Sequence, residues 1–135
     1  MIRHISIGNS DIFSLPVDVL VPAALPDVIT EVNIDSVKAK MIIEAANIPI
    51  RPELEEVLRR KGVLIIPDFL ANAGGVISSY AEYKGYNPKQ MFTLVERKIR
   101  RNTNLVLEYS KEKGIGLRDA ALNIAKERIL RVHQN

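Results

Sequence analysis

The sequence predicts an α/β protein in which a three-stranded parallel sheet with crossover helices is followed by a C-terminal helical segment. Three short runs, at residues 17–21, 41–46 and 63–66, are almost continuously apolar, as expected of strands buried on both faces of a parallel sheet. A segment with clear helix signals separates the second run from the third. The second half of the chain keeps a helical period and contains no further strand-like run.

The segment at residues 52–62 has typical helix signals at both ends. It begins with a proline, carries acidic residues in its first turn and basic residues in its last, and stops at a glycine. Each of these features is typical of a helix start or a helix end. Leu54, Val57 and Leu58 follow the i, i+3, i+4 spacing, so we expect this stripe to pack on the sheet. Strand, helix and strand of this length predict a right-handed crossover.

Four further helices are expected. A short helix at residues 27–32 would lie between the first two strands, and a helix at 72–83 would follow the third strand. Asn87 is expected to be the N-cap and Pro88 the first residue of a longer helix that ends at Gly114. A last helix is expected at 117–132. The positions expected to face inward in this last helix are Ala120, Ala121, Ile124 and Ile129. Without internal repeats or linkers, residues 1–135 are expected to form a single domain.

The composition excludes several classes of protein. The chain has 135 residues, of which 47% are hydrophobic and 26% charged, a makeup typical of one soluble globular domain. No apolar run approaches the roughly 18 to 20 residues of a membrane span, and no leader pattern opens the chain, so we expect a cytoplasmic protein without membrane contact. With no cysteine, and histidine only at His4 and His133, neither a disulfide framework nor a metal site is expected.

The basic surplus of the C-terminal half is concentrated at Arg97, Lys98, Arg100 and Arg101. The cluster has no interleaved aromatic residues for base stacking. We therefore expect a solvated or subunit-facing helix surface and no nucleic-acid partner.

The segments that follow the three strands are small or carry an amide. They are residues 22–24, 46–47 and 71–75. In open parallel sheets ligands bind at the carboxyl ends of the strands, and an Asn amide can both donate and accept hydrogen bonds. A bound ligand and a purely structural or interaction domain are both compatible with these segments, since small residues also serve close packing. Lys40 and Glu44 resemble an acid–base pair but are interpreted as structural charges.

Several sequence blocks together resemble the glutamate/leucine/phenylalanine/valine dehydrogenase family, and most of all its glutamate dehydrogenases. The most specific block reads Pro67-Asp-Phe-Leu-Ala-Asn-Ala-Gly-Gly75. The other matching positions are residues 18–25, residues 38–47, Ser79, Tyr80, Glu82 and residues 118–121. The resemblance implies the later half of a Rossmann-type NAD(P)-binding domain together with the helices that follow it.

The resemblance also implies a role for five residues. Ala23 and Ala24 would line the ribose and nicotinamide side of the cofactor crevice, and Asn47 would face the nicotinamide amide. Asn72 would lie between cofactor and substrate. Ser79 would hold the side-chain carboxylate of glutamate, because a hydroxyl can donate to a charge that an apolar residue would leave unpaired.

The implied reaction is reversible oxidative deamination of glutamate to 2-oxoglutarate with NAD or NADP. The family's catalytic lysines and aspartate belong to an N-terminal substrate domain, so no catalytic residue is assigned here and no turnover is expected from this chain alone. It would be a fragment or subunit of such an enzyme, acting as a homo-oligomer or with an N-terminal portion. The alternative is a non-catalytic remnant that serves as a binding or assembly module.

Three departures from the family pattern concern the pocket and one helix start. Ala81 replaces an aromatic residue, and Ser78 stands where an apolar residue is usual. Arg51 replaces a small hydroxyl residue before the helix at 52–62 and so removes an N-cap. We also expect the first strand to be an edge strand, covered by residues 1–7 or by a second copy of the chain.

Overall fold

A computed structural model describes residue 8 and residues 11–133. The chain forms two compact units, the first up to Ile65 and the second from Ile66 onward. The first unit contains the sheet and its crossover, and the second is helical.

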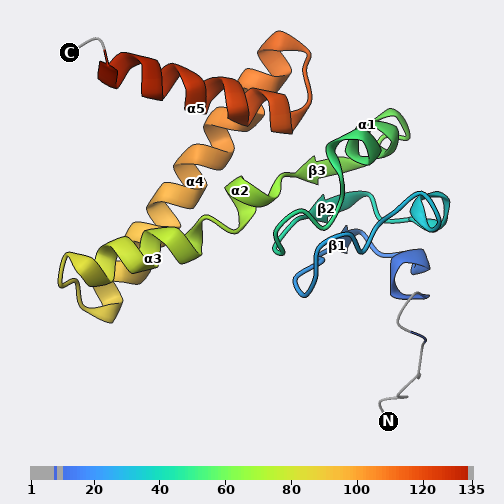
Figure 1. The fold of residues 1–135 in the computed structure, drawn as a ribbon, viewed down its shortest axis with the longest axis horizontal. Coiled ribbons are helices and arrows are strands. Elements are labelled where there is room, and N and C mark those ends of the chain that lie inside the picture. The colour runs from blue at the N-terminus through green and yellow to red at the C-terminus, as the bar shows by residue number, and fades with distance from the viewer. Residues whose placement is uncertain (1–7, 9–10, 134–135) are drawn as a thin grey trace. The chain divides into compact units, whose positions relative to one another are not determined.

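The sheet consists of three parallel strands, as predicted. They are β1 (Val19–Leu20), β2 (Met41–Ile43) and β3 (Leu64–Ile66), in the order β1-β2-β3, and Figure 1 shows them side by side. In the register Val19 is paired with Met41. Each strand is shorter than its apolar run, so the flanking residues of the runs lie in the connecting loops.

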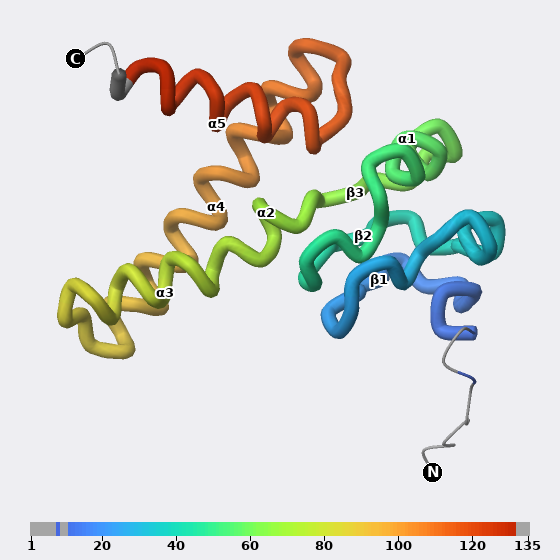
Figure 2. Tube along the Cα trace, viewed as in Figure 1, coloured from blue at the N-terminus to red at the C-terminus, as the bar shows by residue number. Residues whose placement is uncertain are grey.

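Helix α1 (Pro52–Arg60) connects β2 to β3, as the helix signals predicted, and Figure 2 traces this connection. Leu54 and Leu58 are buried, but the expected third member of the stripe, Val57, is 39% exposed. That part of the prediction was wrong: the buried side chain beside Leu54 is instead that of Glu55. The hydrophobic core of the unit is formed by Leu20, Ile29, Ile34, Ala39, Ile42, Ile50, Leu54, Leu58, Val63 and Ile65.

The helix expected at residues 27–32 is absent. The backbone N–H groups of Val28 and Ile29 both donate to the carbonyl of Pro49, at 3.0 and 3.1 Å, and Ile29 forms a parallel bridge with Ile50. These long-range bonds hold residues 28–30 in an extended conformation, and residues 31–33 form a turn. A 3-10 helix, η2 (Ile34–Ser36), follows this segment, and another, η1 (Asp11–Ser14), precedes β1.

The second unit contains four helices among the residues that the structure describes. They are α2 (Asp68–Ala71), α3 (Gly74–Tyr83), α4 (Pro88–Lys113) and α5 (Leu117–His133). The last three agree with the predicted helices, whereas the single turn of α2 was not predicted. Helix α4 packs against α2, α3 and α5, and Figure 1 shows α3 along its first turns and α5 crossing its last turns.

The ends of α4 follow from local sequence. The Asn87 side chain accepts a hydrogen bond from the Gln90 N–H at 2.9 Å, and the Gln90 side chain accepts one from the Asn87 N–H at 3.0 Å, which is a complete capping box. Gly114 ends the helix with a φ of 66°, a left-handed conformation that glycine adopts without steric cost.

Helix α5 is buried mainly through its first turns. Ala120 and Ala121 lie in a second core cluster with Leu70, Val106 and Leu117. The prediction that Ile129 faces inward was wrong, since this residue is 59% exposed. In Figure 1 the C-terminal turns of α5 extend past the crossing with α4, which explains why the inward face does not continue.

Candidate functional site

The loops that follow β1 and β2 are joined by backbone hydrogen bonds. The N–H groups of Ala45 and Ala46 both donate to the carbonyl of Pro22, at 3.1 and 2.8 Å. Because the strands are parallel, these bonds lie at the carboxyl edge of the sheet, where open α/β sheets bind ligands. The two strand ends are thereby fixed to each other.

Three of the predicted site residues follow this junction directly. Ala23 and Ala24 come one and two residues after Pro22, and Asn47 comes one residue after Ala46. All three side chains are exposed. The structure therefore gathers them at the carboxyl edge of the first unit, with small methyl groups on one loop and an amide on the other.

Ile48, the residue after Asn47, has a left-handed backbone. Its φ is 48°, a conformation that costs a β-branched residue about 1 to 2 kcal/mol. Its carbonyl accepts a hydrogen bond from the N–H of Asp27 at 3.0 Å, which helps to hold the backbone there. Such outliers concentrate at functional sites, where the surrounding structure imposes them.

An ion pair fixes the other side of this loop. The Arg51 guanidinium donates to both carboxylate oxygens of Asp27, at 2.5 and 2.6 Å. These hydrogen bonds lower the pKa of Asp27 and raise the pKa of Arg51. As expected, Arg51 provides no side-chain cap for α1. The sequence did not reveal that it binds a residue 24 positions earlier.

Asn72 and Ser79 belong to the second unit. Asn72 is the C-cap of α2, and its carbonyl accepts a hydrogen bond from the Gly75 N–H at 3.2 Å. A methyl group added at Gly75 would meet no atom within 4 Å, whereas one at Gly74 would touch Val95 at 3.4 Å. The start of α3 therefore lies close to α4 at its first glycine and is open at its second.

The hydroxyl of Ser79 donates to the Gly75 carbonyl at 3.2 Å. Ser78 donates to the same carbonyl at 2.7 Å. Ser79 is exposed and Ser78 is only partly so. Because a hydroxyl rotates freely about its bond, Ser79 can exchange its longer bond for one to a ligand.

A buried ion pair holds the segment that precedes Asn72. Arg118, in the first turn of α5, donates to the Asp68 carboxylate at 3.1 Å, and the side chains are 18% and 10% exposed. The guanidinium also lies over the ring of Phe69, 5.3 Å from its centre. Both partners occur in the family-like blocks, but neither the pairing nor its span of 50 positions could be read from the sequence.

The remaining charged groups behave as surface or structural residues. Lys40 pairs with Asp18 at 2.7 Å on the surface, and Glu44 is fully buried. The basic side chains at residues 97, 98, 100 and 101 are exposed. Within the described part of the chain, no cluster of acidic residues or histidines could hold a metal ion, and no helix is long and apolar enough to cross a membrane.

A parallel sheet with small and amide-bearing loops at its carboxyl edge is typical of open α/β proteins, which bind their ligands at that edge. The family of glutamate, leucine, phenylalanine and valine dehydrogenases matches residues 3–135. The chain belongs to this family.

Among its relatives, the glutamate dehydrogenase of Aeropyrum pernix is 44% identical over 96% of the chain and 33% of its own length. That of Thermotoga maritima is 37% identical over 91% of the chain and 31% of its own length. The chain thus spans about a third of these relatives.

Solved structures show the same fold. The L-tryptophan dehydrogenase of Nostoc punctiforme matches 96% of the chain and 39% of its own chain, with 33% identity and a TM-score of 0.85. The hetero-hexameric glutamate dehydrogenase of Thermus thermophilus matches 95% of the chain and 32% of its own chain, with 28% identity and a TM-score of 0.82.

Proposed function

We propose that the chain contributes part of the cofactor and substrate crevice of a glutamate dehydrogenase-like enzyme, which catalyses reversible NAD(P)-dependent oxidative deamination. The observation that carries the proposal is the junction at Pro22, which fixes the exits of β1 and β2 to each other at the carboxyl edge of the sheet. Family membership and 44% identity to the Aeropyrum pernix enzyme support it.

The residues at this edge suit the nicotinamide end of the cofactor. The exposed methyl groups of Ala23 and Ala24 leave room for a flat ring beside the backbone. The Asn47 amide offers a donor and an acceptor, as a carboxamide requires. When bound, NAD or NADP supplies the hydride acceptor for the amino-acid α-carbon.

In the second unit, Asn72 is proposed to orient substrate against cofactor, and Ser79 to donate to the distal carboxylate of glutamate. A neutral hydroxyl satisfies that charge, and an apolar side chain would not. Alanine methyls, amides and a hydroxyl do not act as bases at neutral pH. The contribution of these residues is therefore binding and orientation, and proton transfer is left to groups outside this chain.

A chimeric enzyme tests the proposal. This chain would replace the matching third of the Aeropyrum pernix glutamate dehydrogenase, and glutamate-dependent reduction of NAD and NADP would be measured. We expect activity in the chimera. A folded chimera that gives no reduction would contradict the proposal and favour the alternative of a binding or assembly module.

Ser79→Val in the chimera tests the substrate contact. Losing one hydrogen bond to a buried charge is worth roughly 1.5 to 3 kcal/mol, so kcat/KM for glutamate should fall about ten- to 150-fold, with little change for norvaline. Ser78→Val is the matched control, because Ser78 bonds to the same Gly75 carbonyl, and it should leave glutamate use intact. Equal losses for glutamate and norvaline would show that Ser79 does not hold the carboxylate.

A further inference from the structure

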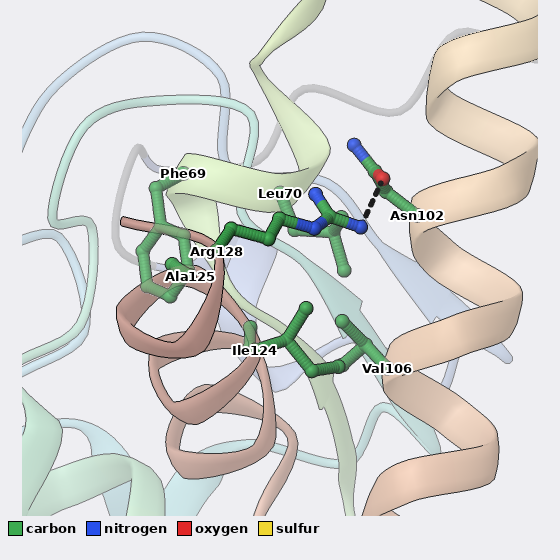
Figure 3. Close-up of a pocket in the computed structure, with 8 residues that line it drawn as sticks. Phe69, Leu70, Asn102, Val106, Ile124, Ala125 and Arg128 are labelled. Carbon is green, nitrogen blue, oxygen red and sulfur yellow. Dashed lines mark hydrogen bonds between the residues drawn. The ribbon is translucent and has the colours of Figure 1, made fainter. Parts of the chain in front are cut away.

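The second unit contains a pocket that none of the candidate site residues line. It lies among α2, α4 and α5 and has a volume of about 140 Å³. Figure 3 shows its lining residues, with Phe69 and Leu70 on α2, Asn102 and Val106 on α4, and Ile124 and Arg128 on α5. An apolar cavity of about 150 Å³ is sufficient for a benzene ring, so the volume fits one ring or a short branched chain.

Most of the pocket wall is apolar. Leu70 and Val106 are buried members of the second core cluster, and Ile124 packs against them. Figure 3 shows Ile124 and Val106 directed toward each other across one side, and Phe69, which also lines the pocket, is 39% exposed. These walls favour an apolar ligand body, because its burial removes hydrocarbon surface from water.

Among the described residues, the cation at the rim of the pocket is paired with a neutral group. The Arg128 guanidinium donates to the Asn102 side-chain oxygen at 3.2 Å, as the dashed line in Figure 3 marks. Other arginines of α5 pair with carboxylates, Arg118 with Asp68 at 3.1 Å and Arg131 with Glu127 at 3.6 Å. Among the described residues, Arg128 has no such carboxylate partner.

We propose that this pocket binds a small monocarboxylate with a ring or branched apolar body. A guanidinium has five N–H donors, and one bond to an amide leaves a pair of them for a carboxylate in the bidentate geometry that arginine favours. The apolar body would occupy the space between Phe69 and Val106, with its carboxylate at the rim beside Arg128. The proposal depends only on the second unit and is independent of the proposed dehydrogenase function.

Benzoate is a suitable probe, and benzamide is its uncharged counterpart of nearly the same shape. The full chain would be titrated with each while the NMR signals of the methyl groups of Val106 and Ile124 are followed. We expect saturable shifts of these methyl groups and about tenfold tighter binding of benzoate, since a charge-assisted hydrogen bond is worth about 1.5 kcal/mol or more. Shifts spread over the surface without saturation would overturn the proposal.

Two substitutions separate the contact from a general effect of charge. Arg128→Gln should remove the preference for benzoate over benzamide. Lys126→Gln removes the same charge from the same helix at an exposed residue outside the pocket lining and should leave the preference unchanged. Equal losses in both variants would mean that benzoate is attracted only by net charge, which contradicts the proposal. Ala125→Leu, which adds bulk at the pocket wall, should weaken both probes.

Discussion

The buried ion pair between Arg118 and Asp68 provides the sharpest test of how the second unit is held together. In the substitution Arg118→Met, an unbranched apolar side chain replaces the guanidinium and leaves the Asp68 carboxylate, only 10% exposed, without its cation. Removing one partner of a buried pair costs about 3 to 5 kcal/mol, because the remaining charge stays desolvated. Since both side chains keep some contact with water, we expect a loss near the lower end, about 3 kcal/mol.

This loss is large for a unit of this size. About 70 residues correspond to a total stability of about 3.5 to 10 kcal/mol, so the variant should lose about 30% or more of the stability of the unit. The assay is urea unfolding of the chain followed by far-ultraviolet circular dichroism, which reports the helices. With a denaturant dependence of about 1 kcal/mol per molar urea, the midpoint of the helical unit should fall by roughly 3 M.

Arg100→Met is the matched control. The pair between Arg100 and Glu96 has the same 3.1 Å separation, but its side chains are 77% and 66% exposed, and such surface pairs contribute under about 1 kcal/mol. Adding Asp68→Asn to Arg118→Met should recover part of the loss, because the buried negative charge is then removed together with its cation. The reasoning is refuted if Arg118→Met costs no more than Arg100→Met, or if the second substitution makes the loss greater.

Three further predictions follow from other parts of the chain. Hydrogen bonds from Arg59, and then from Arg60, hold the pKa of Glu56 at about 2, below its ordinary 4.5. The ionised Glu56 therefore contributes its full stabilisation of the folded state above pH 4.5, and this contribution is lost as the pH falls through 2. Glu56→Gln should slightly lower the urea midpoint of the first unit at neutral pH, and a difference that persists undiminished near pH 2 would contradict this. The purified chain alone should give no glutamate-dependent reduction of NAD or NADP above a blank free of host dehydrogenase, and clear turnover would overturn that expectation. In the described residues β1 is an edge strand, so we expect either self-association or coverage by residues 1–7, which lie outside the described residues; a strict monomer by light scattering with freely exchanging β1 amides would show that neither occurs.

The sequence determined those elements whose signals are local. The near-continuous apolar runs predicted three parallel strands, and the proline start, charge distribution and glycine stop predicted α1. The capping pair at Asn87 and Gln90 and the left-handed Gly114 are likewise local, which is why the ends of α4 agree with the prediction. The resemblance of the blocks to a dehydrogenase family could also be recognised from residues alone, and the family match covers residues 3–135.

Only the tertiary structure decided which distant residues meet. The segment at 27–32 has a pattern compatible with a helix, but hydrogen bonds from Val28 and Ile29 to Pro49 hold its central part extended, and no local signal encodes a partner about 20 residues away. In the sequence Arg51 indicates only that the N-cap side chain of α1 is missing, whereas in the structure it binds Asp27. Ile129 fits the helical period of α5 but is exposed because the helix extends past its partner. Periodicity specifies the face of an element, whereas burial depends on whether another element reaches that face.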